Sequence, residues 1–186
     1  MATSKKTFTT PKGTAVYPHL NRADYAFNSD GVFTTKLRLP ADQAKTLMDT
    51  VRAVAQDEFG KKATSAKLPW KIDEETGDVV LVAKSKFKSK FMDSTGKLIS
   101  ENNVPEIYGG SVLKLAGTLY AWSAGGAHGV TLQLGGVQIV TLAEPVGSFE
   151  FEPEEDGFIA GNDNQANDNH AGEAADGETK REAYDF

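Results

Sequence analysis

Two strand-like segments between residues 111 and 142 limit the fold more than any other feature. Residues 111–124 (SVLKLAGTLYAWSA) and 129–142 (GVTLQLGGVQIVTL) are rich in apolar and β-branched residues, and Gly125–Gly126 lies between them. Segments of this composition bounded by glycine are typical of paired β-strands. A second glycine pair, Gly135–Gly136, interrupts the alternation and predicts a β-bulge or a sharp bend at a barrel corner. The chain is therefore expected to be mainly β.

Three earlier segments also read as strands, at residues 13–20, 31–40 and 78–92. Residues 75–78 (ETGD) form a turn before the last of these. The alternation is cleanest in residues 31–40, because strand side chains point to opposite faces in turn. One face there carries Phe33, Thr35, Leu37 and Leu39, and the other carries Val32, Thr34, Lys36 and Arg38.

One helix interrupts the strands. Residues 41–59 place apolar side chains on a single helical face, between Pro40, which ends the preceding strand, and Gly60, which ends the helix. The members of that face are Ala44, Leu47, Met48, Val51 and Ala55. Five or six strands with one inserted helix predict an OB-fold, a small Greek-key barrel.

The charge is divided unevenly along the chain. Residues 1–147 hold 18 basic and 14 acidic residues, a net charge of +4, whereas residues 148–186 hold 2 and 12, a net charge of −10; together they give the −6 of the whole chain. The acidic segment lacks hydrophobic periodicity and is expected to be disordered, because it cannot bury enough apolar area to offset its ordering entropy. Its terminal residues Tyr184, Asp185 and Phe186 are candidate docking residues for a partner. We therefore expect a folded domain over 1–147 and an acidic tail over 148–186.

The basic segment KSKFKSKF carries lysine at every second position, at Lys84, Lys86, Lys88 and Lys90. Along a strand these side chains would point the same way, about 6.6 Å apart, and Phe87 and Phe91 would point into the core. Aligned like charges repel one another, so the row favours contact with the backbone of a single nucleic-acid strand. The alternative is an edge strand made basic to prevent aggregation.

Tyr120 and Trp122 are two residues apart and therefore share one face of their strand. Exposed rings beside lysines serve as stacking platforms for bases, at about 1–3 kcal/mol per base; the alternative is packing in the core. With the lysines they define a candidate DNA-binding groove. Its predicted residues are Lys36, Arg38, Lys84, Lys86, Lys88, Lys90, Tyr120 and Trp122, with Lys114 and Arg22 as weaker candidates.

Enzymatic classes find little support. The chain has no cysteine, and its three histidines, His19, His128 and His170, are far apart without partners at triad or metal spacing. No glycine-rich loop ends in Lys-Ser or Lys-Thr, which argues against a nucleotide triphosphatase. We expect no catalytic residue, no metal and no cofactor. The sequence also lacks a bilayer-length apolar run and a signal-peptide core, which predicts a cytoplasmic protein without a membrane partner.

The sequence resembles the single-stranded DNA-binding proteins of the T-odd tailed phages through nearly its whole length. The tract from Val104 to Leu142 (VPEIYGGSVLKLAGTLYAWSAGGAHGVTLQLGGVQIVTL) is the most specific part, in combination with the terminal Asp185–Phe186. Further matching residues are Phe8–Thr9, Gly13–Ala15, Asp24–Tyr25, 31–40 and the basic segment.

The resemblance implies an OB-fold that binds single strands without sequence preference during phage DNA replication, recombination and repair, in the infected bacterial cell. It further implies contacts with the phage DNA polymerase and helicase-primase, a homodimer, and an acidic tail that competes with DNA for the groove. Two alternatives stay open. One is a single-strand annealing recombination protein, and the other is a virion or structural β-protein whose acidic tail keeps it soluble.

Overall fold

The computed structural model describes residues 6–26, 28–145 and 147. The chain divides into two units, Met1–Gly147 and Ser148–Phe186, and every described residue belongs to the first. The acidic segment, with its candidate docking residues Tyr184 to Phe186, lies outside the described residues.

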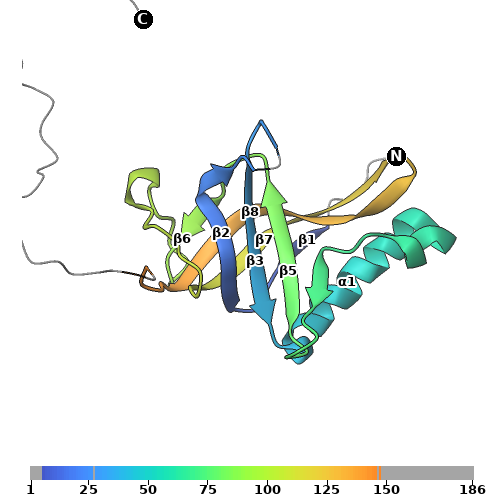
Figure 1. The fold of residues 1–186 in the computed structure, drawn as a ribbon, viewed down its shortest axis with the longest axis horizontal. Coiled ribbons are helices and arrows are strands. Elements are labelled where there is room, and N and C mark those ends of the chain that lie inside the picture. Colours follow the sequence, from blue (N-terminus) through green and yellow to red (C-terminus); the bar gives the residue numbers. More distant parts are fainter. Residues whose placement is uncertain (1–5, 27, 146, 148–186) are drawn as a thin grey trace, which may run out of the picture. The chain divides into compact units, whose positions relative to one another are not determined.

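The described residues form eight strands of one sheet (Figure 1). Strands β2, β3, β5, β8 and β7 follow one another around a closed barrel, because β7 pairs with both β8 and β2. Among the described strands the parallel pairings are those of β8 with β5 and with β6. This barrel is the OB-fold that the sequence predicts. The strands are β1 (Thr7–Thr9), β2 (Gly13–Asp24), β3 (Val32–Leu39), β4 (Trp70–Ile72), β5 (Val79–Ser85), β6 (Lys90–Met92), β7 (Val112–Ala124) and β8 (Ala127–Thr141).

The inserted helix α1 spans Ala41–Phe59, as predicted, between β3 and β4. It starts after Pro40 and ends at Gly60, where a short 3₁₀ helix, η1 (Gly60–Ser65), follows; a second, η2, spans Glu101–Asn103. The helix packs against β7 and β8. Its buried face contains the five predicted residues together with Val54: Ala44, Leu47, Met48, Val51, Val54 and Ala55.

The glycine pairs of β7 and β8 act as predicted. Gly125 and Gly126 both have positive φ, 57° and 82°, and connect the two strands in a tight hairpin. In the ladder of these strands, Ala116 faces Gly136 and Gly117 faces Leu134, so Gly135 has no partner. The bulge predicted at Gly135–Gly136 is therefore confirmed, and it bends both strands around the barrel.

The predicted continuous strand over 78–92 is wrong. It is divided into β5 and β6, with residues 86–89 between them. Lys84 faces Gln133 and Lys90 faces Gly136 on the same neighbour, β8, so six positions of one chain match only three of the other. Residues 86–89 therefore protrude, and we call them the 86–89 bulge. The hydroxyl of Ser85 accepts a hydrogen bond from the Phe87 amide at 3.1 Å, a local turn bond that competes with strand pairing.

The bulge separates the two phenylalanines that the sequence places in the core. Phe91 is buried at 2% exposure, as predicted, but Phe87 is 75% exposed. The core placement of Phe87 is therefore wrong, and the four lysines do not form one row along a strand.

This difference has a direct consequence for stability. We expect Phe87→Ala to change the free energy of unfolding by less than about 0.5 kcal/mol, because an exposed ring loses little packing. Urea denaturation measures the change, with Phe91→Ala as the control that empties a core position. Equal destabilisation by the two variants would contradict the exposed position of Phe87.

Candidate nucleic-acid interface

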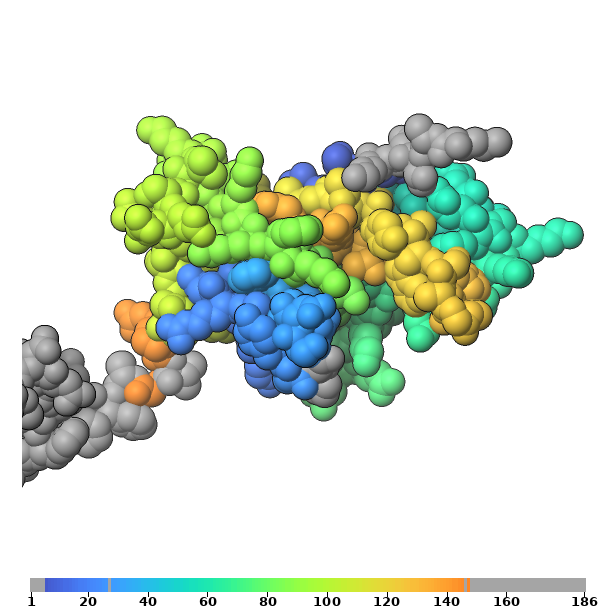
Figure 2. Space-filling model, turned by 90° about the horizontal axis from the view of Figure 1, so that it is seen from above, coloured from blue at the N-terminus to red at the C-terminus, as the bar shows by residue number. Residues whose placement is uncertain are grey.

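A groove of about 510 Å³ opens between the β7–β8 hairpin and the β2–β3 loop, residues 25–31. Figure 2 shows this end of the barrel, with the hairpin in yellow, the loop in blue and the green 86–89 bulge between them. Four of the predicted site residues meet in the groove. Its lining consists of Asn28, Val32, Lys84, Ser85, Lys86, Tyr120, Trp122, Thr131 and Gln133.

Of the two lysines of the groove, Lys84 lies near the end of β5 and Lys86 is the first residue of the 86–89 bulge. Lys84 faces Thr34 on β3 and Gln133 on β8, and Gln133 accepts a hydrogen bond from Thr118 on β7 at 3.1 Å. Within the described residues no carboxylate forms an ion pair with Lys84, and Lys86 lies 3.8 Å from Asp30, with both side chains largely exposed. A pair so exposed holds its cation weakly. Both ammonium groups are therefore accessible to an anionic ligand.

The two aromatic side chains of the groove lie on β7. Tyr120 faces Thr131 on β8 and is 56% exposed. Trp122 is half-buried and faces Gly129, where an added Cβ would lie 3.1 Å from Cζ2 of the indole ring. Glycine at 129 leaves room for the Lys67 backbone, whose carbonyl oxygen would lie 2.5 Å from an added Cβ, and for the indole. Both rings present a surface next to the lysines.

Lys67 is a cation near this site that the sequence reasoning did not find. Its backbone pairs with β8 through two hydrogen bonds of 2.9 Å. The Lys67 amide donates to the His128 carbonyl, and the Val130 amide donates to the Lys67 carbonyl. Its side chain is exposed, and an added Cβ at Gly129 would lie 2.9 Å from its Cβ. Lys67 stands alone in an irregular segment, so no periodicity marks it in the sequence.

Lys36 is on the outer face of β3, where its alternation predicts it, but it does not line the groove. It faces Val82 on β5, and this pair lies two residues along the strands from the pair of Thr34 and Lys84. Its ammonium nitrogen is 5.6 Å from the ring centroid of Tyr17 on β2.

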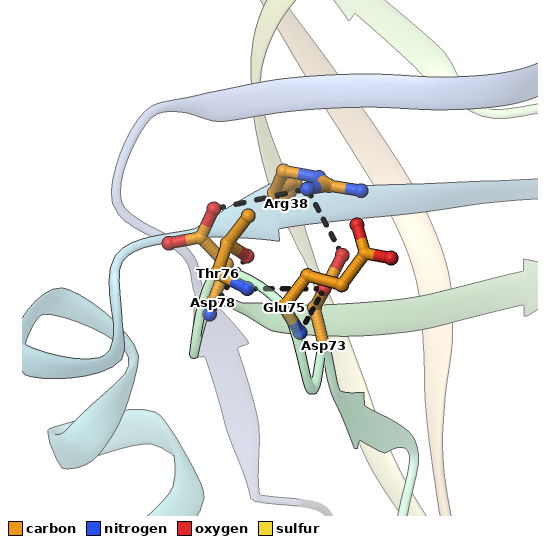
Figure 3. Close-up of polar contacts among 5 residues, drawn as sticks. All are labelled: Arg38, Asp73, Glu75, Thr76 and Asp78. Carbon is orange, nitrogen blue, oxygen red and sulfur yellow. Dashed lines mark hydrogen bonds and ion pairs between the residues drawn. The ribbon is translucent and has the colours of Figure 1, made fainter.

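Arg38 is held by the turn that precedes β5 (Figure 3). Its guanidinium is 3.0 Å from the Asp73 carboxylate and 3.9 Å from that of Asp78. Hydrogen bonds from the Thr76 and Glu75 amides lower the pKa of Asp73, and the charge of Arg38 lowers it further. The carboxylate therefore stays ionised, and Arg38 is neutralised within the protein and lies outside the groove.

The other predicted cations also lie outside the groove lining. Lys88, in the 86–89 bulge, is 3.2 Å from Glu101, and Lys90 is exposed on β6. Lys114 is half-buried opposite Gln138, and Arg22 lies 3.5 Å from Glu106 beside a separate pocket of about 560 Å³. Contact of these four side chains with a nucleic acid stays a prediction.

Two further findings concern the described residues. They contain no group of three or more His, Cys, Asp or Glu side chains that could hold a metal ion. None of their helices is long and apolar enough to cross a membrane.

Comparison with known proteins found matches among solved structures, whereas no family model and no curated protein matches the sequence. Gp2.5, a single-stranded DNA-binding protein encoded by bacteriophage T7, is 28% identical with a TM-score of 0.59, and the match covers 85% of this chain and 100% of that chain. The single-stranded DNA-binding protein from bacteriophage Enc34 is 16% identical with a TM-score of 0.61, over 78% and 87% of the two chains. The structure of that protein in complex with single-stranded DNA gives 18% identity and a TM-score of 0.62, over 76% and 89%.

The Enc34 likeness is one of fold, and the T7 likeness adds sequence identity over the whole solved T7 chain. Both agree with the closed five-stranded barrel described above. They confirm the resemblance, read from the sequence, of this chain to the phage single-stranded DNA-binding proteins.

Proposed function

We propose that residues 1–147 bind single-stranded DNA without sequence preference, and that the groove is the central part of the binding surface. The observation that carries the proposal is the meeting of two exposed lysines, Lys84 and Lys86, with the rings of Tyr120 and Trp122. OB-folds bind oligonucleotides on the face of their second and third strands and with two flanking loops. In this barrel those elements are β3, β5, the β2–β3 loop and the β7–β8 hairpin, which surround the groove.

In the proposed mode of binding, lysines contact the phosphates and aromatic rings contact the bases. Lysine ammonium groups neutralise phosphates and release counterions, which provides affinity for any sequence. Tyrosine and tryptophan rings stack on base faces, which every nucleotide offers. Stacking on a flat ring requires an unpaired base, so the combination favours single strands over duplex.

Titration of the full chain with oligo-dT tests the function. We expect binding that quenches the fluorescence of Trp122, with much weaker binding to a duplex of equal length. Trp122→Phe is the control, because it removes the reporting indole, keeps a ring and leaves Trp70 on β4 as the remaining tryptophan. No detectable binding to oligo-dT at low salt would contradict the proposal and favour a structural β-protein.

We further propose that the acidic segment 148–186 competes with DNA for the groove. Its net charge of −10 stands against +4 for the rest of the chain. A segment tethered by a short flexible linker reaches an effective concentration in the millimolar range, so weak docking on exposed lysines is enough to compete. Tyr184, Asp185 and Phe186 then engage replication proteins, the phage DNA polymerase and helicase-primase, when DNA displaces the segment. Roles in recombination and repair belong to the same proposal.

Ending the chain after Gly147 is expected to tighten oligo-dT binding several-fold at low salt. The gain should shrink as salt rises, because screening weakens the hold of the tail on the lysines. A titration series with the full chain, the shortened chain and a chain lacking only Phe186 measures the effect. Deleting Phe186 removes one ring and only shifts the terminal carboxylate, so DNA affinity should change little. A shortened chain that binds no better than the full chain would leave the tail without a competing role.

A further inference from the structure

Tyr17 is held in an unusual backbone conformation. Within the described residues it is the one non-glycine residue with positive φ, at 48°. It lies where the pairing of β2 with β3 shifts register, between Val16 and His19. Bulky residues rarely adopt this conformation, and such outliers persist where the surrounding structure imposes them, often at functional sites.

The ring of Tyr17 is exposed at this shift of register. The side chain is 74% exposed, so burial of the ring does not account for the strain. Its neighbour is the exposed Lys36, whose ammonium nitrogen lies 5.6 Å from the ring centroid. The surface at this point therefore repeats the chemistry of the groove, an accessible ring next to an accessible cation.

This second ring and cation lie on the same outer face as the groove. Lys36 and Thr34 are neighbours on that face of β3, and Thr34 pairs with Lys84 of the groove. From Tyr120 on β7 the face continues over β8, β5 and β3 to Tyr17 on β2. Four steps between strands at about 4.8 Å each make a path of about 19 Å. The two rings thus mark the ends of one continuous strip, with lysines between them.

We propose that Tyr17 is a second base-stacking platform and that Lys36 contacts the adjacent phosphate, so that a single strand crosses the sheet from Tyr120 to Tyr17. This inference rests on the proposed function and adds a subsite beyond the groove. The strand must be long enough to cover both rings before Tyr17 contributes. The contribution of Tyr17 should therefore depend on oligonucleotide length.

Oligo-dT of about two nucleotides, too short to cover a path of about 19 Å, and of about sixteen nucleotides, the upper end of OB-fold site sizes, separates the two platforms. Tyr17→Ala in the full chain should weaken binding of the long oligonucleotide about fivefold or more and leave the short one unchanged. Tyr120→Ala should weaken both. Tyr17→Phe keeps the ring and should keep the affinity.

Tyr17→Gly separates stacking from folding. Glycine adopts positive φ without a steric penalty, so this variant should unfold at the same or a higher temperature while losing the same affinity as Tyr17→Ala. A lower melting temperature would make the ring a structural element and overturn the proposal.

Two other outcomes would also overturn it. Unchanged affinity of Tyr17→Ala for the long oligonucleotide, with Tyr120→Ala still impaired, removes the second platform and leaves the groove function intact. Equal losses on both oligonucleotides mean that Tyr17 acts through the groove rather than beyond it. If neither Tyr17→Ala nor Tyr120→Ala changes binding, the groove function itself fails.

Discussion

Replacing Tyr120 by alanine is expected to weaken oligo-dT binding by about 1–3 kcal/mol, the usual value of one base stacked on an aromatic side chain. The ring lines the groove beside Lys84 and Lys86 and is 56% exposed, so a base can reach it. Because tyrosine carries no charge at neutral pH, the slope of log K against log salt should stay nearly unchanged. Fluorescence titration at several salt concentrations measures both quantities.

Tyr120→Phe is the matched control, since it keeps the ring and removes only the hydroxyl; it should bind like the natural protein. Trp122→Ala should weaken binding by a similar amount to Tyr120→Ala but should also lower the stability of the fold, because the Trp122 ring is half-buried against Gly129. A Tyr120→Ala variant that unfolds, or that binds normally while folded, would remove this ring from the binding surface.

The double variant Lys84→Ala, Lys86→Ala is expected to make the salt slope less steep by about 1.4, at about 0.7 for each phosphate contact of a single strand. Its affinity should accordingly be lowest, relative to the natural protein, at low salt. Both lysines line the groove, and the one ion pair that they form within the described residues joins Lys86 to Asp30 at 3.8 Å. The measurement is a titration with oligo-dT at four or more salt concentrations.

Two single variants sharpen this experiment. Lys45→Ala removes one exposed charge near the start of α1 and should leave the slope unchanged. The helix follows the C-terminal end of β3, whereas Val32, at the N-terminal end of that strand, lines the groove. Lys88→Ala should change the slope less than Lys86→Ala, because Lys88 is paired with Glu101 outside the groove. Equal effects of Lys86 and Lys88 would favour the row of lysines that the sequence alone suggests.

The sequence by itself determines much of this fold. Alternation over 31–40 gives the correct core face of β3; the spacing of five apolar residues gives α1, and Pro40 and Gly60 give its ends. The glycine pairs locate the hairpin at 125–126, where positive φ favours glycine, and the bulge at 135, where they interrupt the alternation. These features depend on local sterics and on a single repeating period, and both can be read from neighbouring residues. The family resemblance, which rests on matching residues along the chain, is confirmed by the solved structures.

Only the tertiary structure decides which of the predicted side chains meet. The period of two in KSKFKSKF does not reveal that residues 86–89 leave the ladder, since β5 and β6 are aligned by their separate pairing with β8. Phe87 is exposed for that reason. Arg38 is paired with Asp73, 35 positions further along, and the backbone of Lys67 pairs with β8 at Gly129, the residue that faces Trp122. Charge pairing and the curvature of a closed barrel bring together segments that are distant in the chain. Local sequence patterns therefore do not predict which carboxylate or ring lies next to a given cation.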